Sequence, residues 1–229
     1  MEMIYKSARL EKQALSESEL ALINKQSLRE LSADEVFAFR LAACDNQVDR
    51  DNERFTDETL EGLAKLYIGK PVLRDHRWSA ETQTARVYDA QVVADGDIKR
   101  LVLSCYMVRT ASTADTIAAI EGGILRECSV GCTVQHVNCS ICGADQRTTL
   151  CQHWGGQEYD GETCHFDLAG ACDAYEVSLV AVPAQPEAGT LKTKRYGGTE
   201  EKGPTAPGGA DDKTLWTEEA ALELEKMRF

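Results

Sequence analysis

Arg126-Glu-Cys-Ser-Val-Gly-Cys-Thr-Val134 alternates between polar and apolar residues, as a β-strand with one buried face does. Because successive side chains of a strand point to opposite faces, the core side is expected to carry Cys128, Val130, Cys132 and Val134. The polar side is expected to carry Glu127, Ser129, Gly131 and Thr133. Ser129 then stands exposed on a rigid strand, and Gly131 leaves room for another backbone to approach beside its hydroxyl. This arrangement predicts that Ser129 is a nucleophile.

Further strands are expected on both sides of this segment. Apolar-rich runs predict them at 36–43, 71–75, 86–94, 98–108 and 174–183. Three helices are expected. The first starts at Ser16, which has Glu19 three positions later, and its apolar spacing reaches Leu28. The other two are expected from Asp57 to Gly69 and from Ser112 to Gly122. Several strands with few helices between them predict an α+β fold, built on a mainly antiparallel β-sheet or a small β-barrel flanked by helices.

The chain of 229 residues is long enough for one domain with appendages. Residues 1–34 are polar and predict an N-terminal helical extension. The main domain is expected at 35–189, with a Cys-rich insertion at 136–172. Gly and Pro pairs then predict a flexible linker, followed by a C-terminal helix, within 190–229.

Composition argues against two classes of partner. The chain has 25 Lys and Arg against 38 Asp and Glu, a formal charge of -13, and no local basic patch, so we expect no direct nucleic-acid binding. Its apolar runs are too short to span a membrane, and its N-terminus lacks the pattern of a signal peptide. These features predict a protein of the cytoplasm.

Cysteines concentrate in one part of the sequence, since six of the nine fall between Cys132 and Cys172. In a reducing compartment such a cluster favours a metal site over disulfides, although reduced surface thiols remain an alternative. Two intervening residues allow both thiolates of Cys139-Ser-Ile-Cys142 to reach one ion. Cys151 is the next expected zinc ligand, and His153 and Cys164 compete for the fourth position. Four protein ligands would close the site, so the zinc is expected to be structural.

A nucleophilic serine needs a base to accept its proton and a third group to orient that base. Of the four histidines, His153 and His165 lie within the cysteine cluster and His136 leads into it, which leaves His76 as the candidate base. Glu176 opens the apolar run Val-Ser-Leu-Val-Ala-Val, where an unpaired carboxylate is costly to bury. We therefore expect Glu176 to have a partner, such as an imidazole.

Three short motifs occur in order over roughly 35–189. They are Gly69-Lys-Pro-Val-Leu-Arg-Asp-His76, Cys128-Ser-Val-Gly131 and Glu176-Val-Ser-Leu-Val-Ala-Val-Pro-Ala-Gln185. In type and order these motifs resemble those of the prohead proteases of tailed phages, capsid maturation serine peptidases that share the herpesvirus assemblin fold. The common form of the family does not need the Cys-rich insertion, which is treated as an elaboration seen in some members.

The resemblance implies a serine endopeptidase with a triad of Ser129, His76 and Glu176. It also implies an oxyanion site made by backbone amides near Val130 and Gly131. The chain departs from the assemblins, which have a second histidine where Glu176 stands and an arginine pair further on, where this chain has Ala184 and Gln185. Because the arginine pair helps to stabilise the oxyanion in the assemblins, this chain lacks that contribution to its oxyanion site.

The resemblance further implies substrates and a place of action. The expected substrates are the phage scaffolding protein, the major capsid protein and the enzyme itself, cleaved inside the assembling prohead in the cytoplasm of the bacterial host. The oligomeric state stays open, a homo-oligomer included. The alternative is a non-catalytic capsid-assembly or zinc-ribbon interaction protein. A zinc peptidase is disfavoured because the sequence has no His-Glu-x-x-His motif.

Overall fold

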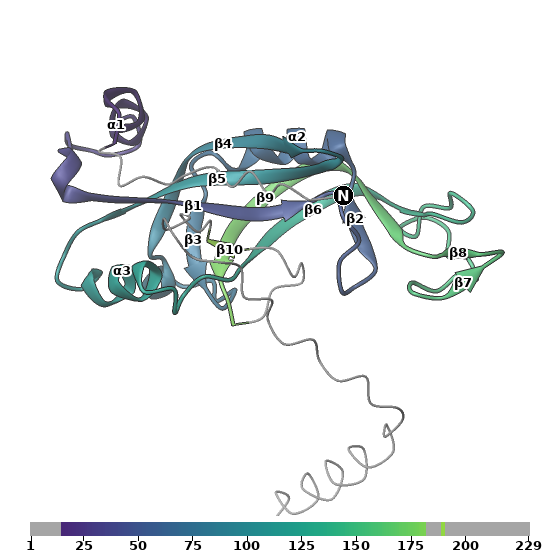
Figure 1. The fold of residues 1–229 in the computed structure, drawn as a ribbon. Helices are drawn as coiled ribbons and strands as arrows, with labels where there is room; N and C mark the ends of the chain where they lie inside the picture. Colours follow the sequence, from purple (N-terminus) through teal and green to yellow (C-terminus); the bar gives the residue numbers. More distant parts are fainter. Residues whose placement is uncertain (1–14, 182–188, 191–229) are drawn as a thin grey trace, which may run out of the picture. The chain divides into compact units, whose positions relative to one another are not determined.

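The computed structural model describes residues 15–181 and 189–190, which form a mixed eight-stranded sheet and a separate two-stranded one (Figure 1). The strands of the large sheet are β1 (Val36–Asp45), β2 (Glu53–Phe55), β3 (Pro71–Arg74), β4 (Ala85–Asp95), β5 (Ile98–Val108), β6 (Cys128–Cys139), β9 (Phe166–Leu179) and β10 (Gly189–Thr190). β7 (Glu158–Tyr159) and β8 (Glu162–Thr163) form the small sheet. The predicted linker and C-terminal helix lie outside the described residues.

Three α-helices accompany the sheet: α1 (Glu17–Asn24), α2 (Asp57–Tyr67) and α3 (Ala114–Glu121). Two 3-10 turns, η1 (Ala33–Glu35) and η2 (Ala80–Thr82), complete the elements. The predicted start of α1 is confirmed, because Ser16 and Glu19 form a reciprocal capping box. Its predicted extent was too long: the helix ends before Leu28, whose side chain is fully exposed.

The sheet runs in the order β10-β1-β5-β4-β3-β9-β2, and β6 pairs with β9 outside this path. Most pairings are antiparallel, as predicted, but β2 and β3 both run parallel to β9. The alternative of a small barrel is wrong for the described residues, because no ladder joins β1 to β6. One edge of β1 pairs with β5, and at Leu41 and Ala42 the other edge pairs with β10 rather than with β6.

The apolar face of α2 closes the main core. Leu60, Leu63 and Tyr67 recur at helical spacing and are fully buried, and α2 packs against β4, β5 and β9. Thr56 caps the helix by accepting a hydrogen bond from the Thr59 N–H, as its place before the first turn favours. The helix ends before Gly69, whose φ of +83° suits glycine.

The antiparallel ribbon of β6 and β9 carries most of the candidate site. Its ladder runs from Cys128 opposite Leu179 to Cys139 opposite Phe166. Two register shifts interrupt it, between Gly131 and Cys132 and between Thr133 and Val134. Residues 136–139 and 166–172, expected within the Cys-rich insertion, lie in these two strands, so the segment outside the ribbon is 140–165.

Candidate active site and metal centre

The ladder of β6 and β9 brings two of the predicted catalytic positions to one face of the sheet. Ser129 lies directly opposite Ser178, and Gly131 lies directly opposite Glu176. Side chains of directly opposed residues share a face, and alternate residues along a strand do as well. Ser129, Ser178 and Glu176 therefore project from the same side of the ribbon.

His76 reaches this face from β3. Beyond Arg74, which pairs with Leu179, the chain turns through two residues with positive φ, Asp75 at +55° and His76 at +52°. The Asp75 N–H donates to the Leu179 carbonyl at 3.0 Å, and the His76 N–H donates to the Ser178 hydroxyl at 3.1 Å. The turn thus places the imidazole beside β9.

The imidazole of His76 and the carboxylate of Glu176 are in contact, with 2.8 Å between Nδ1 and Oε1. Glu176 is 2% exposed, so the expectation that this carboxylate is buried and paired is confirmed. Its second oxygen, Oε2, accepts a short hydrogen bond from the Ser178 hydroxyl. A proton on Nδ1 that is donated to Glu176 leaves Nε2 as the hydrogen-bond acceptor, the tautomer that a general base requires.

Gly131 also has a role that the sequence does not indicate. A Cβ built on Gly131 would lie 2.5 Å from Oε1 of Glu176, far inside contact distance. The missing side chain therefore makes room for the buried carboxylate. The Tyr67 hydroxyl donates to the Gly131 carbonyl at 3.1 Å and holds this point of the strand from the helix side. Burial raises the pKa of the Tyr67 phenol well above its ordinary value, so it stays a donor.

Ser129 itself is half-buried rather than exposed. No hydrogen bond joins its hydroxyl to the His76 ring within the described part of the chain, so the structure assembles the His76–Glu176 pair without the Ser129–His76 contact. Ser178, the other hydroxyl on this face, is fully buried and bonded to both His76 and Glu176. Of the two serines, Ser129 is the one that a substrate can reach.

A cavity of about 240 Å³ adjoins Ser129 and is lined on β6 also by Cys128, Val130 and Cys132. The side chains of Cys128 and Val130 point away from the face that carries Glu176, since they alternate with Ser129. The cavity therefore lies toward the other side of β6 from His76. Its rim carries three acidic residues, Asp49, Asp51 and Glu53, and burial raises the pKa of Asp49 and of Glu53.

Four side chains of the Cys-rich segment gather in one place. The ligand atoms of Cys139, Cys142, Cys151 and His153 all lie within 4.8 Å of one another. The Cys139 Sγ and the His153 Nδ1 are 3.6 Å apart. Zinc bonds of about 2.3 Å to sulfur and 2.0–2.1 Å to nitrogen require tetrahedral edges of roughly 3.5–3.8 Å, so these residues fit a tetrahedral ion after a small contraction.

Cys164 lies close to this set but outside it. Its Sγ is 3.9 Å from that of Cys139, and it is fully buried. Burial raises the pKa of the Cys164 thiol. Burial also acts on Cys139, but N–H groups of Cys142 and Ile141 outweigh it and lower the pKa of that thiol. Of the two candidates for the fourth ligand, the geometry favours His153.

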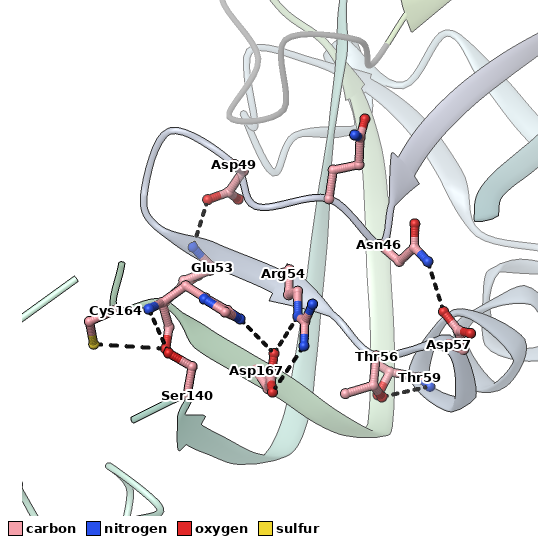
Figure 2. Close-up of polar contacts among 12 residues, drawn as sticks. Asn46, Asp49, Glu53, Arg54, Thr56, Asp57, Thr59, Ser140, Cys164 and Asp167 are labelled. Carbon is pink, nitrogen blue, oxygen red and sulfur yellow. Dashed lines mark hydrogen bonds and ion pairs between the residues drawn. The ribbon is translucent and has the colours of Figure 1, made fainter. Parts of the chain in front are cut away.

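The base of this segment is tied to both strands of the ribbon. The His165 N–H donates to the Ser140 hydroxyl at 2.9 Å, and the Ser140 N–H donates to the His165 carbonyl at 2.9 Å. Arg54 of β2 donates to Asp167 of β9 beside this junction, as Figure 2 shows. The metal cluster therefore begins where β6 ends, ten residues beyond Ser129 on the same strand.

Sequence reasoning missed the residues that support the site. In the sequence Tyr67 is an ordinary core position and Ser178 is only a polar residue in an apolar strand. Their contacts with His76, Glu176 and Gly131 distinguish them. Two aromatic residues beside the site were also missed. Trp78 is 72% exposed and its ring lies 5.5 Å from that of Tyr175, next to Glu176 in sequence. The sequence signal for them was a tryptophan two positions after the candidate base, in a polar stretch.

No protein-family model matches the chain, and no curated protein or solved structure shows significant similarity to it. No helix in the described parts of the chain is long and apolar enough to cross a membrane.

Proposed function

We propose that the protein is a serine endopeptidase that uses Ser129, His76 and Glu176. The observation that carries the proposal is the 2.8 Å hydrogen bond between His76 Nδ1 and the buried carboxylate of Glu176, on the face of the ribbon that also bears Ser129. A half-exposed imidazole oriented by a buried carboxylate is the arrangement of a general base.

In the proposed reaction the Ser129 Oγ attacks a peptide carbonyl and His76 Nε2 takes its proton. Glu176 holds the imidazole in the required tautomer and stabilises the imidazolium that forms. The proton then passes to the leaving amine, and water hydrolyses the acyl-enzyme by the same steps. Backbone N–H groups of Val130 and Gly131 are the proposed donors to the oxyanion. Bonds to a nucleophile often tighten only when substrate binds, and we propose this for Ser129 and His76.

The substrate class rests on the resemblance to the prohead proteases. We propose cleavage of phage scaffolding protein and of a segment of the major capsid protein, with self-cleavage, inside the assembling prohead in the bacterial cytoplasm. Confinement within a shell raises the effective concentration of enzyme and substrate, so modest activity suffices. The charge of -13 supports a protein rather than a nucleic-acid substrate.

We also propose that the cofactor is a structural zinc ion held by Cys139, Cys142, Cys151 and His153. Four protein ligands leave no open position for a substrate, and a bound ion would stabilise the segment 140–165, which has little regular structure apart from β7 and β8. Its role is to order this segment, and no step of the peptidase reaction involves it.

A second candidate function is a non-catalytic capsid-assembly or zinc-ribbon interaction protein. The metal cluster supports it, and so does the absence of a Ser129–His76 hydrogen bond among the described residues. The two candidates differ in whether the Ser129 hydroxyl is activated. An assembly protein needs only the fold and the segment 140–165 with its metal cluster, which we call the metal segment.

A fluorophosphonate probe separates them, because it reacts covalently with activated serine hydroxyls. We expect the probe to label the folded wild-type protein at Ser129, located by peptide mass spectrometry. Ser129→Ala is expected to abolish labelling without changing the circular dichroism spectrum, and Ser140→Ala, a serine in the metal segment, is expected to retain it. Absence of labelling in the folded, zinc-loaded protein would favour the assembly function.

A further inference from the structure

Ser178 lies at the centre of the candidate active site, although the sequence marks it only as a polar residue in an apolar strand. It belongs to β9, the strand between β3 and β6, and it pairs with Leu73 on one side and with Ser129 on the other. β3 leads directly to His76. Ser178 is therefore adjacent to the elements that carry all three proposed catalytic residues.

The Ser178 hydroxyl completes a ring of hydrogen bonds. It accepts from the backbone N–H of His76 at 3.1 Å and donates to Oε2 of Glu176. Glu176 binds the imidazole of the same His76 through its other oxygen, Oε1. One hydroxyl thus connects the backbone of the histidine to the carboxylate that orients its ring.

The backbone at this point needs such support. Asp75 and His76 both have φ values near +50°, a left-handed conformation that non-glycine residues rarely adopt and that is strained for them. Two hydrogen bonds to β9 hold the turn, one from Asp75 to the Leu179 carbonyl and one from His76 to Ser178. Ser178 and Glu176 are both buried, so the hydrogen bond between them is shielded from bulk solvent.

We propose that Ser178 is a positioning residue of the active site, which holds the His76 backbone in its left-handed conformation and fixes the rotamer of Glu176. The part of this inference that concerns reactivity rests on the proposed peptidase function. Ser178 does not touch the substrate and acts only through His76 and Glu176. Its own hydroxyl is committed to these two bonds.

The test compares Ser178→Ala with Ser104→Ala, a buried serine on β5 away from the site. For Ser178→Ala we expect the maximal rate of labelling by a fluorophosphonate probe to fall roughly 10–100-fold, by analogy with the loss of a hydrogen-bond partner that orients a metal ligand. The probe concentration at half-maximal rate is expected to stay unchanged, because Ser178 makes no contact with the probe. Ser104→Ala is expected to label at the wild-type rate.

A second measurement does not depend on reactivity. The His76 Nδ1 proton, hydrogen-bonded to a carboxylate, is expected to give a proton resonance downfield of the amides in the wild-type protein. This resonance should weaken or vanish in Ser178→Ala and persist in Ser104→Ala. Wild-type labelling rates and an unchanged resonance in folded Ser178→Ala would overturn the inference.

Two further outcomes are also decisive. If Ser178→Ala does not fold, amide hydrogen exchange of His76 in the wild-type protein replaces it: a protected amide supports the bond to Ser178, and a fast-exchanging amide refutes it. If wild-type Ser129 is never labelled, the peptidase proposal fails. The imidazole resonance then still tests whether Ser178 positions His76 and Glu176.

Discussion

Glu176 illustrates how single residues shape this site. A carboxylate that is 2% exposed needs compensation for lost hydration, and it receives this from the His76 ring and the Ser178 hydroxyl. Space for it comes from Gly131, across the ladder. His76, Glu176 and Ser178 thus form a hydrogen-bonded cluster, and Gly131 leaves the space that the carboxylate occupies.

Replacement of Glu176 by glutamine tests the orientation of the imidazole. The amide keeps the shape of the carboxylate but can donate to Nδ1, which favours the tautomer with its proton on Nε2. We expect the rate of Ser129 labelling by the fluorophosphonate to fall by roughly 10²–10⁴-fold, with the fold retained. Glu127→Gln, a change of the same chemistry at a residue that pairs with Arg126, is the control and should label normally. Equal rates for the two variants would contradict the role of Glu176.

Replacement of Gly131 by alanine tests the space around the carboxylate. Because the added Cβ would lie 2.5 Å from Oε1, Glu176 must move, and we expect a loss of about 1–3 kcal/mol in the free energy of unfolding and a labelling rate at least 10-fold lower. Gly62→Ala, in which the Cβ would meet that of Ala171 at 2.8 Å, is the control for steric strain alone. It should lower stability and leave the His76 imidazole resonance intact. Urea unfolding measures the loss of stability in each variant, and proton spectra show whether the His76 imidazole resonance is kept.

At the scale of elements, the ribbon of β6 and β9 joins the two proposed sites. Ser129 and Cys139 lie on one strand, and Glu176 lies on the other. The register shift after Gly131 leaves Tyr175 as an extra residue on β9, and such a bulge re-aims neighbouring side chains. The exposed ring of Tyr175 lies against that of Trp78, so the bulge contributes to the surface beside His76.

Zinc binding should require all four proposed ligands and should not require the other nearby thiols. We expect the wild-type protein to bind one zinc ion per chain, and Cys139→Ser or His153→Ala to abolish stoichiometric binding. Cys172→Ser, at an exposed cysteine of β9, and Cys164→Ser should both retain the ion. Metal analysis after dialysis measures this. Retention by His153→Ala together with loss by Cys164→Ser would assign the fourth ligand to Cys164 instead.

Removal of the ion should affect one element selectively. Because the ion would be held within 139–153, a chelator is expected to increase amide hydrogen exchange in 140–165 and to leave β4 and β5 protected. Hydrogen-exchange mass spectrometry resolves the two regions. Uniform loss of protection across the sheet would show instead that the whole domain requires the metal.

At the scale of the whole molecule, burial divides the cysteines into classes. Cys44, Cys105 and Cys128 lie in the core, and burial raises the pKa of each thiol, to about 12 in the case of Cys128. Cys172 is exposed. The ligands Cys139, Cys142 and Cys151 form a third class, whose thiols would be protected by an ion. Cys132 is half-buried and belongs to none of these classes.

These classes predict an order of alkylation by iodoacetamide at pH 8. Cys172 should react first, and Cys142 and Cys151 should react only after chelation. The three core thiols should react only on unfolding, since both low thiolate fraction and lack of access slow them. Peptide mass spectrometry over time measures the order. Rapid alkylation of Cys105 or Cys128 in the native protein would contradict the packing of β5 and β6.

Local patterns in the sequence were sufficient for most elements. The apolar stripe of α2, the capping box of α1 and the hairpin of β4 and β5 depend on neighbouring residues, and all three were predicted near their observed bounds. The Cys139–Cys142 spacing likewise limits how far apart two thiols can lie. Burial and pairing of Glu176 followed from the cost of placing a charge in an apolar strand.

Contacts between distant segments could not be predicted, because they depend on which strands become neighbours and in what register. Parallel pairing of β3 with β9 brings His76 to Ser178, and antiparallel pairing of β6 with β9 sets Gly131 against Glu176. β10 takes the edge of β1 that a closed barrel would have needed. Residue types and local periodicity therefore indicated Ser129 as the candidate nucleophile, His76 as the candidate base, a partner for Glu176, and three of the four metal ligands. The assignment of Ser129, His76 and Glu176 to one triad came from the resemblance to the prohead proteases. The pairing of His76 with Glu176, and the contacts of both with Ser178, arose from strand register, which no local pattern encodes.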